Sequence, residues 1–110
     1  MYQLFLDDLR MPPKDGRKWI IARSMADAIH CIDTLGMPCH ISFDHDLGEG
    51  INNAHVPSGK DFANWLVDYI IDHEYTAIPF TWQVHSANPV GADNIRKLLD
   101  GFEREYFGDQ

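Results

Sequence analysis

The segment HISFDHD, residues 40–46, passes from a short apolar run directly into two acids and a histidine. Its first five residues have the composition of a buried β-strand. The same arrangement occurs twice more: QLFLD (3–7) continues into a second aspartate, and FTWQVH (80–85) continues into Ser-Ala-Asn. A fourth apolar run, KWIIA (18–22), is the remaining strand candidate. Three strands that each end in polar groups predict a sheet with its chemistry at one edge.

Helical patterns lie between and after these runs. Ser24 is placed to cap a helix over 25–35, and Ser58 with Asp61 forms a capping-box signature before a second helix. Asn88-Pro89 has the N-cap and first-turn proline of a third helix. Alternating strands and helices predict an α/β three-layer sandwich with a mostly parallel sheet of about four strands and helices on both faces.

The first connection departs from this pattern. Residues 8–17 contain Met11-Pro12-Pro13 and Asp15-Gly16, which favour a loop and block a helix interior. A parallel crossover needs a dozen or more residues and is usually helical. We therefore expect a degenerate first crossover.

Length and charge limit the class of protein. A chain of 110 residues predicts one domain, 1–110, and its nine Lys and Arg against 17 Asp and Glu give a net charge of −8. This charge argues against duplex DNA as a partner. No segment is long and apolar enough for a membrane span or a signal peptide, and two cysteines suit a reducing compartment, so we expect a cytoplasmic protein.

The acids suggest a metal site. In a parallel sheet of order 2-1-3-4, ligands bind at the carboxyl ends of the strands where the order reverses, which lies between Asp7-Asp8 and Asp44-Asp46. Two carboxylates about 4 Å apart repel by roughly 4 kcal/mol at an effective dielectric near 20, and a divalent cation removes that cost. Oxygen ligands favour Mg²⁺, and an added histidine would favour Mn²⁺. The alternative is that the aspartates only form a solvated turn or a helix cap.

Groups around these acids could bind and protonate a phosphate. His85 or His45 could donate a proton to a departing oxygen, and Arg10 with Asn88 could hold phosphate oxygens. Free N–H groups near Gly91, at a helix start, form a potential anion site. The alternatives are that Asn88 is only a helix cap and that His85 is a satisfied strand-end histidine.

Two further groups lie along the chain. Lys60 could reach phosphate from its helix start, or could be a solvated lysine, because the surrounding SGKD does not complete a phosphate-binding loop. His55 could act in the long segment 47–57, although a plain loop histidine is the simpler interpretation.

Four blocks together resemble the cyclic-phosphate processing receiver family: LFLDDLRMPP (4–13), ISFDHDLG (41–48), SGKDFANWL (58–66) and HSANPVGADNI (85–95). The resemblance implies a receiver-like, flavodoxin-like fold and an acidic metal pocket. It also implies a histidine motif that processes cyclic phosphates on nucleotides or RNA ends.

The same resemblance assigns roles to individual residues. It implies that Asp7 and Asp8 are the acidic metal pair, that Asp44 ends the phosphoacceptor strand, and that Ser86 is the phosphate-contacting hydroxyl. His85 and Asn88 are then additions of this family. No fifth strand ending in lysine follows the last helix, which argues against phosphotransfer signalling.

Three functions remain open from the sequence. The first is a Mg²⁺- or Mn²⁺-dependent phosphoesterase that opens a cyclic phosphate by water attack, on a small phosphate-containing substrate or an RNA end. The second is a haloacid-dehalogenase-type phosphatase with Asp44 as nucleophile and Asp46 as acid. The third is a receiver-like module that binds metal, phosphate or a partner and turns nothing over.

Overall fold

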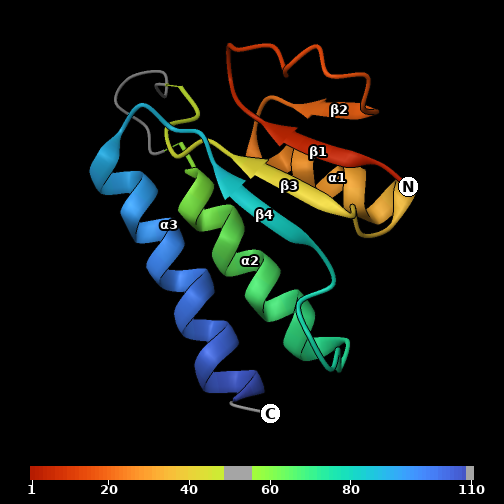
Figure 1. The fold of residues 1–110 in the computed structure, drawn as a ribbon, viewed down its shortest axis with the longest axis vertical. Coiled ribbons are helices and arrows are strands. Elements are labelled where there is room, and N and C mark those ends of the chain that lie inside the picture. The colour runs from red at the N-terminus through yellow and green to blue at the C-terminus, as the bar shows by residue number, and fades with distance from the viewer. Residues whose placement is uncertain (49–55, 109–110) are drawn as a thin grey trace.

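The computed structural model describes residues 1–48 and 56–108, so His55 and most of the segment 47–57 lie outside the described residues (Figure 1). The elements follow the chain order expected from the sequence: the helix over 25–35 has the expected bounds, and each strand is one residue shorter than expected at one or both ends. They are β1 (Gln3–Leu6), β2 (Trp19–Ala22), α1 (Met25–Leu35), β3 (His40–Phe43), α2 (Gly59–Asp72), β4 (Thr81–Val84), α3 (Pro89–Phe102) and the π-helical turn η2 (Glu103–Phe107).

The four strands form one parallel sheet in the order β2-β1-β3-β4. Leu6 is in register with Phe43, and Phe43 with Val84, so three strands end at the same level. The backbone extends the ladder by one step, because the N–H of Asp44 donates to the carbonyl of Leu6 at 2.9 Å. The strand order that we expected is therefore confirmed, and the polar groups after β1, β3 and β4 lie at one edge.

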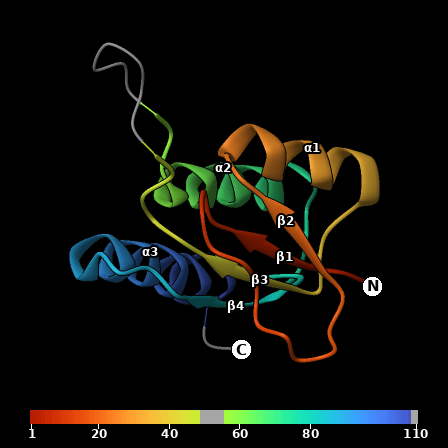
Figure 2. The ribbon, with the colours of Figure 1, turned by 90° about the horizontal axis from the view of Figure 1, so that it is seen from above.

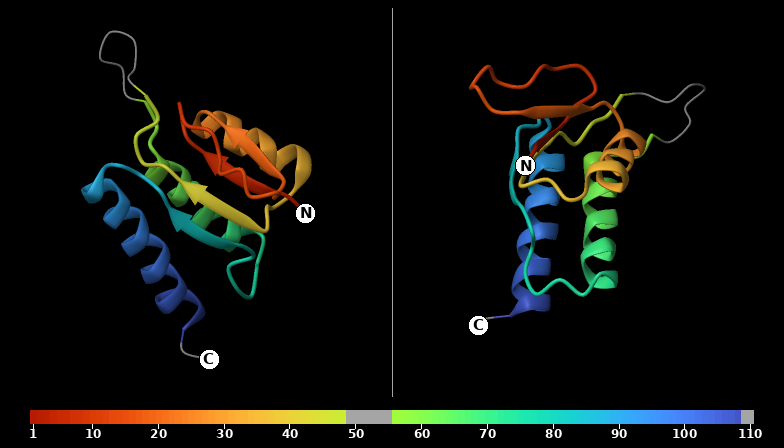
Figure 3. Two further views of the ribbon diagram at one scale, coloured as in Figure 1. Left: turned by 45° about the horizontal axis from the view of Figure 1, so that its top comes forward. Right: turned by 90° about the vertical axis from the view of Figure 1, so that its right-hand side faces the viewer.

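Alternate strand residues point to opposite faces of the sheet. Leu4, Leu6, Ile41 and Phe43 are fully buried in the core beneath α1 and α2. Helix α3 packs against α2 and β4. Figures 2 and 3 show the described helices on one side of the sheet.

The α/β class and the parallel sheet are confirmed, but the expectation of helices on both faces differs from the structure. The reason is the first crossover. Right-handed connections from β1 to β2 and from β2 to β3 run in opposite directions across the sheet, so they must pass over opposite faces. The β1–β2 connection, residues 7–18, contains no helix, as the proline pair Pro12-Pro13 predicts. One face of the sheet therefore lacks a covering helix within the described residues, and we call it the open face.

The helix starts agree with the sequence signals. Ser24 caps α1, Ser58 and Asp61 form the reciprocal capping box of α2, and Asn88 caps α3 with proline in the first turn. Gly59, at the start of α2, lies so close to the Asp44 carbonyl that a Cβ there would overlap it. Only glycine allows α2 to begin directly against the end of β3. Within the described residues, no helix has the length and apolar character to cross a membrane.

Candidate functional site

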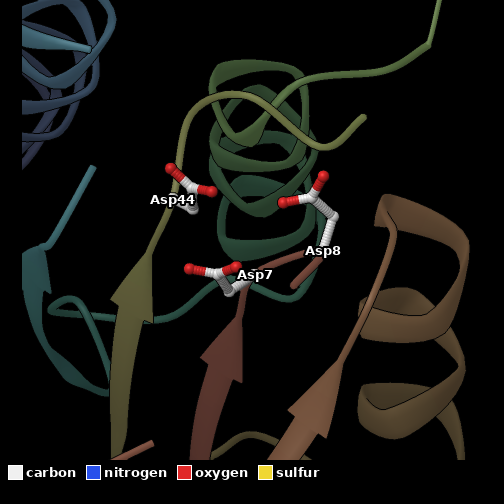
Figure 4. Close-up of side chains that lie close together, drawn as sticks. All are labelled: Asp7, Asp8 and Asp44. Atoms are coloured by element: carbon white, nitrogen blue, oxygen red, sulfur yellow. The ribbon is translucent and has the colours of Figure 1, made fainter. Parts of the chain in front are cut away.

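Three carboxylates meet at the carboxyl edge of the sheet. Asp7 and Asp8 follow β1, Asp44 follows β3, and their side chains point into the space between the two strands (Figure 4). One oxygen from each lies within 4.8 Å of the others. Asp7 and Asp44 are buried and Asp8 is half-buried. The structure thus brings together three of the four acids that we predicted as metal ligands.

Asp7 is held ionised by its surroundings. Burial raises the pKa of this carboxyl, but hydrogen bonds from the backbone N–H groups of Arg10 and Leu9 and from His85 outweigh that effect, so the pKa lies below its usual value. Both N–H groups donate to Oδ1 at 2.8 Å. The Arg10 guanidinium lies 3.7 Å from Oδ2. The site therefore favours a negative charge at Asp7.

The imidazole ring of His85 points at Asp7. Its Nε2 lies 2.9 Å from Asp7 Oδ2 and its Nδ1 lies 2.7 Å from Ser42 Oγ. Because an ionised carboxylate only accepts, Nε2 carries the proton of this hydrogen bond, and Ser42 Oγ is the partner of Nδ1. The ring also stacks on Phe5 at 4.6 Å, with the planes 5° apart.

The network continues along the open face. Gln83 Nε2 donates to Ser42 Oγ at 3.3 Å, and Gln83 Oε1 lies 3.3 Å from Nε2 of His40. Ser42 is almost fully buried. A row of polar side chains on β3 and β4 therefore supports His85, which in turn supports Asp7.

Asp46 lies apart from the three-carboxylate group. Its Oδ1 is 2.8 Å from His45 Nδ1, and Asn88 Nδ2 donates to its Oδ2 at 3.2 Å. The hydrogen bond from His45 lowers the pKa of Asp46, burial opposes this, and Asn88 lowers the pKa further. The side chain is 64% exposed. Asp46 therefore interacts with His45 and Asn88, and the structure does not place it among the grouped ligands.

Gly91 does not provide the free N–H group of the anion site that we expected. Its N–H donates to the Asn88 side chain at 3.0 Å, as in any capped helix, so it is already used. A Cβ at Gly91 would overlap the ring of His45. Glycine here lets the start of α3 lie directly on His45, next to the Asp46 pair.

An open cavity of about 530 Å³ lies over the carboxylates. This volume is within the usual range for small-molecule sites. Its walls carry acids, one arginine and small polar groups, from Asp8, Arg10, Asp44, Asp46, Gly48, Ser86, Ala87 and Asn88. The Arg10 guanidinium donates to the His85 carbonyl at 3.1 Å, which holds a positive charge beside the acids. Lys60 is exposed at the first turn of α2 and is not part of this wall.

Three residues that support the site were missed by the sequence reasoning: Ser42, Gln83 and Arg23. The Arg23 guanidinium donates to the carbonyls of Asp7 at 3.1 Å and of Arg10 at 2.6 Å, and so fixes the start of the first crossover. A signal for the first two was present. His40 and Ser42 alternate in one strand, as do Thr81, Gln83 and His85 in the next, and period-two polar residues share one face of a sheet.

Comparison with known families agrees with this geometry. The model of the cyclic-phosphate processing receiver domain matches residues 2–101. The chain belongs to this family. The match includes all four strands, the three grouped carboxylates and His85, so the resemblance noted from the four sequence blocks is confirmed.

Other comparisons add little beyond the fold. One solved structure, whose title describes the yeast Spc42 trimeric coiled coil, amino acids 181–211, in a fusion, is similar to 96% of this chain and 80% of its own chain. The identity is 17% and the TM-score 0.52, so the likeness concerns the fold alone. No curated protein matches the chain. The family therefore links the chain to cyclic-phosphate processing through a receiver domain.

Proposed function

We propose that this protein is a divalent-metal-dependent phosphoesterase that opens cyclic phosphates, such as the 2′,3′-cyclic phosphate of a nucleotide or an RNA end. The observation that carries the proposal is the meeting of Asp7, Asp8 and Asp44 within 4.8 Å, beside a cavity that Asp8 and Asp44 line together with Arg10. In the reaction, water adds to phosphorus, one ester P–O bond breaks, and the departing oxygen takes up a proton to become a hydroxyl.

The donor set fits Mg²⁺ or Mn²⁺. All three potential ligands are carboxylate oxygens, which hard divalent cations prefer. A bound cation supplies a concentrated positive charge that attracts the phosphate and offsets the negative charge of the transition state. Hydrogen bonds from Arg10, Leu9 and His85 keep Asp7 ionised and oriented. Residues that do not touch a metal commonly orient its ligands in this way.

The two histidines take different parts in this proposal. Both ring nitrogens of His85 are engaged, one by Asp7 and one by Ser42, so His85 orients a ligand. His45 has Nδ1 bound to Asp46, while no group in residues 1–48 and 56–108 bonds its Nε2. Because the Asp46 carboxylate accepts from Nδ1–H, Nε2 carries a proton only in the imidazolium form, which the neighbouring carboxylate stabilises. We assign proton donation to His45 in that protonated form.

Contacts of the substrate follow from the cavity wall. Arg10 contributes a guanidinium that suits phosphate oxygens, and Ser86 and Asn88 contribute a hydroxyl and an amide to the same cavity wall. Asp46 is a poor proton donor because its pKa is lowered, which disfavours the alternative of Asp44 as nucleophile with Asp46 as acid. We place the activity in the cytoplasm, where two free cysteines persist.

The test compares wild type with Asp44→Asn in the presence of Mg²⁺ or Mn²⁺ and 2′,3′-cyclic nucleotides. Calorimetry measures Mn²⁺ uptake and chromatography measures the monoester product. We expect wild type to bind Mn²⁺ and form product, and Asp44→Asn to lose both. Asp68→Asn, an exposed acid on α2 with the same change of charge, is the matched control and should keep both.

Each outcome has a meaning. Mn²⁺ binding without turnover in wild type would reject the phosphoesterase and support the binding module. A stable beryllofluoride adduct at Asp44 would support the aspartyl-nucleophile scheme. Absence of Mn²⁺ uptake would reject the metal site itself.

A further inference from the structure

The charge of this acidic protein is distributed very unevenly. Five of the nine Lys and Arg residues, but one of the 17 Asp and Glu residues, lie between positions 9 and 24. The rest of the chain therefore has four basic residues and 16 acidic ones. Such segregation creates a local positive potential that attracts an anion to this segment even though the whole protein is negative. The basic residues are Arg10, Lys14, Arg17, Lys18 and Arg23.

This segment begins at the cavity. Arg10 is in the cavity wall, and the chain then runs from the carboxyl end of β1 back to the amino end of β2, beside the open face (Figures 2 and 3). Its side chains from Lys14 to Lys18 are exposed. We call residues 10–18 the cationic strip. It exists because the first crossover has no helix, whose packed face would bury part of these positions.

Hydrogen bonds hold the backbone of the strip in place, and two of its charges form no ion pair among the described residues. Arg23 fixes its first part through the Arg10 carbonyl, and Asp15 fixes its second part by accepting from Trp19 Nε1 at 3.1 Å. Asp15 also lies 3.6 Å from the Arg17 guanidinium. Lys14 and Lys18 have no acidic partner among the described residues. Two lysines are thus unneutralised on a supported backbone.

Apolar side chains accompany these charges. Leu9 is 83% exposed and Met11 70% exposed, and they flank Arg10, which lines the cavity, in the chain. A row of cations that follows the nucleic-acid backbone is one feature of single-strand binding, in which bases also stack on aromatic side chains. Leu9 and Met11 offer apolar surface for a base in place of an aromatic ring. A mononucleotide that fills the cavity would leave Lys14 and Lys18 without a ligand.

We propose that the cationic strip binds the phosphodiester chain of a single-stranded RNA, whose 3′-terminal cyclic phosphate occupies the carboxylate cavity. This inference rests on the proposed function for the terminal group, whereas the strip itself is tested by binding alone. The acidic remainder of the surface repels a polyanion elsewhere, so the strip and the cavity together select one path for the strand.

The experiment pairs two charge reversals of equal size. Lys14→Glu/Lys18→Glu alters the strip, and Lys97→Glu/Arg104→Glu alters exposed cations of α3 and η2. The probes are a fluorescent RNA of about eight nucleotides with a 2′,3′-cyclic phosphate end, the same RNA with a 3′-hydroxyl, and the cyclic mononucleotide. Anisotropy gives affinity at a series of salt concentrations, and chromatography gives turnover.

We expect wild type to bind both RNAs and to process the cyclic-ended RNA at least tenfold more efficiently than the mononucleotide at low salt. The strip variant should bind RNA about tenfold more weakly. The slope of log affinity against log salt concentration should become shallower by about 1.4, since each of two lost single-strand phosphate contacts contributes about 0.7. The control variant should retain both values.

Two binding results would overturn the proposal, and one turnover result would do so as well. One is equal RNA affinity in the strip variant and wild type, which applies even if no turnover is seen and therefore does not depend on the proposed function. The other is a strip that binds polyglutamate as tightly as RNA, which would indicate an acidic protein partner. If the mononucleotide is turned over as efficiently as the cyclic-ended RNA, the proposed phosphoesterase activity would stand and RNA binding by the cationic strip would be rejected.

Discussion

The two faces of the sheet are made by the same four strands and serve different purposes. On the covered face, Phe43 is fully buried and lies 6.1 Å from the ring of Phe62 on α2. On the open face, Phe5 is 4% exposed, stacks on the ring of His85 and meets Trp19 edge-to-face. One face stabilises the fold through contact area, and the other positions the groups of the site.

This difference shows how a short chain can hold the buried carboxylate of Asp7: one face supplies apolar contacts, and the other supplies hydrogen bonds. Contact area is provided by any apolar side chain of suitable volume, so the covered face tolerates exchange among such residues. A hydrogen-bond row such as His40, Gln83, Ser42 and His85 needs one donor and one acceptor at each step. We therefore expect substitutions on the covered face to change stability most, and substitutions on the open face to change Mn²⁺ binding at the proposed site most.

The largest effect compares two phenylalanines on opposite faces. Phe43→Ala should lower the free energy of unfolding by about 3–5 kcal/mol, because it removes a large side chain and leaves an enclosed cavity. Phe5→Ala should lose roughly half as much, because water can enter the space on the open face. Urea denaturation measures both. Equal losses would mean that the open face is as much a core as the covered one.

The second effect concerns the ligand orientation by His85. His85→Ala should weaken Mn²⁺ binding by about 10- to 100-fold, which is typical when the outer partner of a ligand is removed. Isothermal calorimetry gives the affinity. His30→Ala, an exposed histidine of α1 that lies outside this hydrogen-bond row, is the control and should stay near wild type. An unchanged affinity in His85→Ala would show that Asp7 needs no such partner.

A smaller effect is expected for Ser42. Ser42→Ala removes the hydroxyl at Nδ1 of His85 and should cost about 1 kcal/mol of stability, with a severalfold loss of Mn²⁺ affinity through the freed ring. Ser42→Thr keeps the hydroxyl and should restore the Mn²⁺ affinity. If threonine fails to restore it while the protein remains folded, the serine acts through packing instead of through its hydrogen bond.

The smallest effect is a pH response at the other end of β1. Tyr2 donates to the Gly36 carbonyl at 2.6 Å, and burial, with a smaller contribution from Cys31, raises the pKa of Tyr2 to about 12. An ordinary tyrosine ionises near pH 10 in the unfolded chain. The neutral phenol therefore contributes stability below about pH 10, and this contribution is lost as the pH rises from 10 to 12.

Tyr2→Phe should cost about 1 kcal/mol near neutral pH and flatten the loss of stability between pH 10 and 12. Thermal unfolding at a series of pH values measures this change. A variant that loses stability in that range as steeply as wild type would rule out Tyr2 as the responsible group.

Local signals in the sequence determined the elements and the position of the acids. The apolar runs before Asp7 and Asp44, the capping serines Ser24 and Ser58, and Asn88-Pro89 act over a few residues, so they can be recognised without knowing what packs where. Their common edge followed from parallel strands, and the proline pair indicated the missing helix of the first crossover.

The tertiary structure decided which partner each polar group has. His85 faces Asp7 and Ser42, which are 78 and 43 residues away, and Gly91 lies on His45 instead of presenting a free N–H. Such pairings depend on strand register and on side-chain direction across neighbouring strands, which no local pattern encodes. The sequence by itself therefore determined the edge where the chemistry gathers. Only the packed sheet decided that His85 has both ring nitrogens engaged, one of them by a buried carboxylate, while His45 has one ring nitrogen without a partner among the described residues.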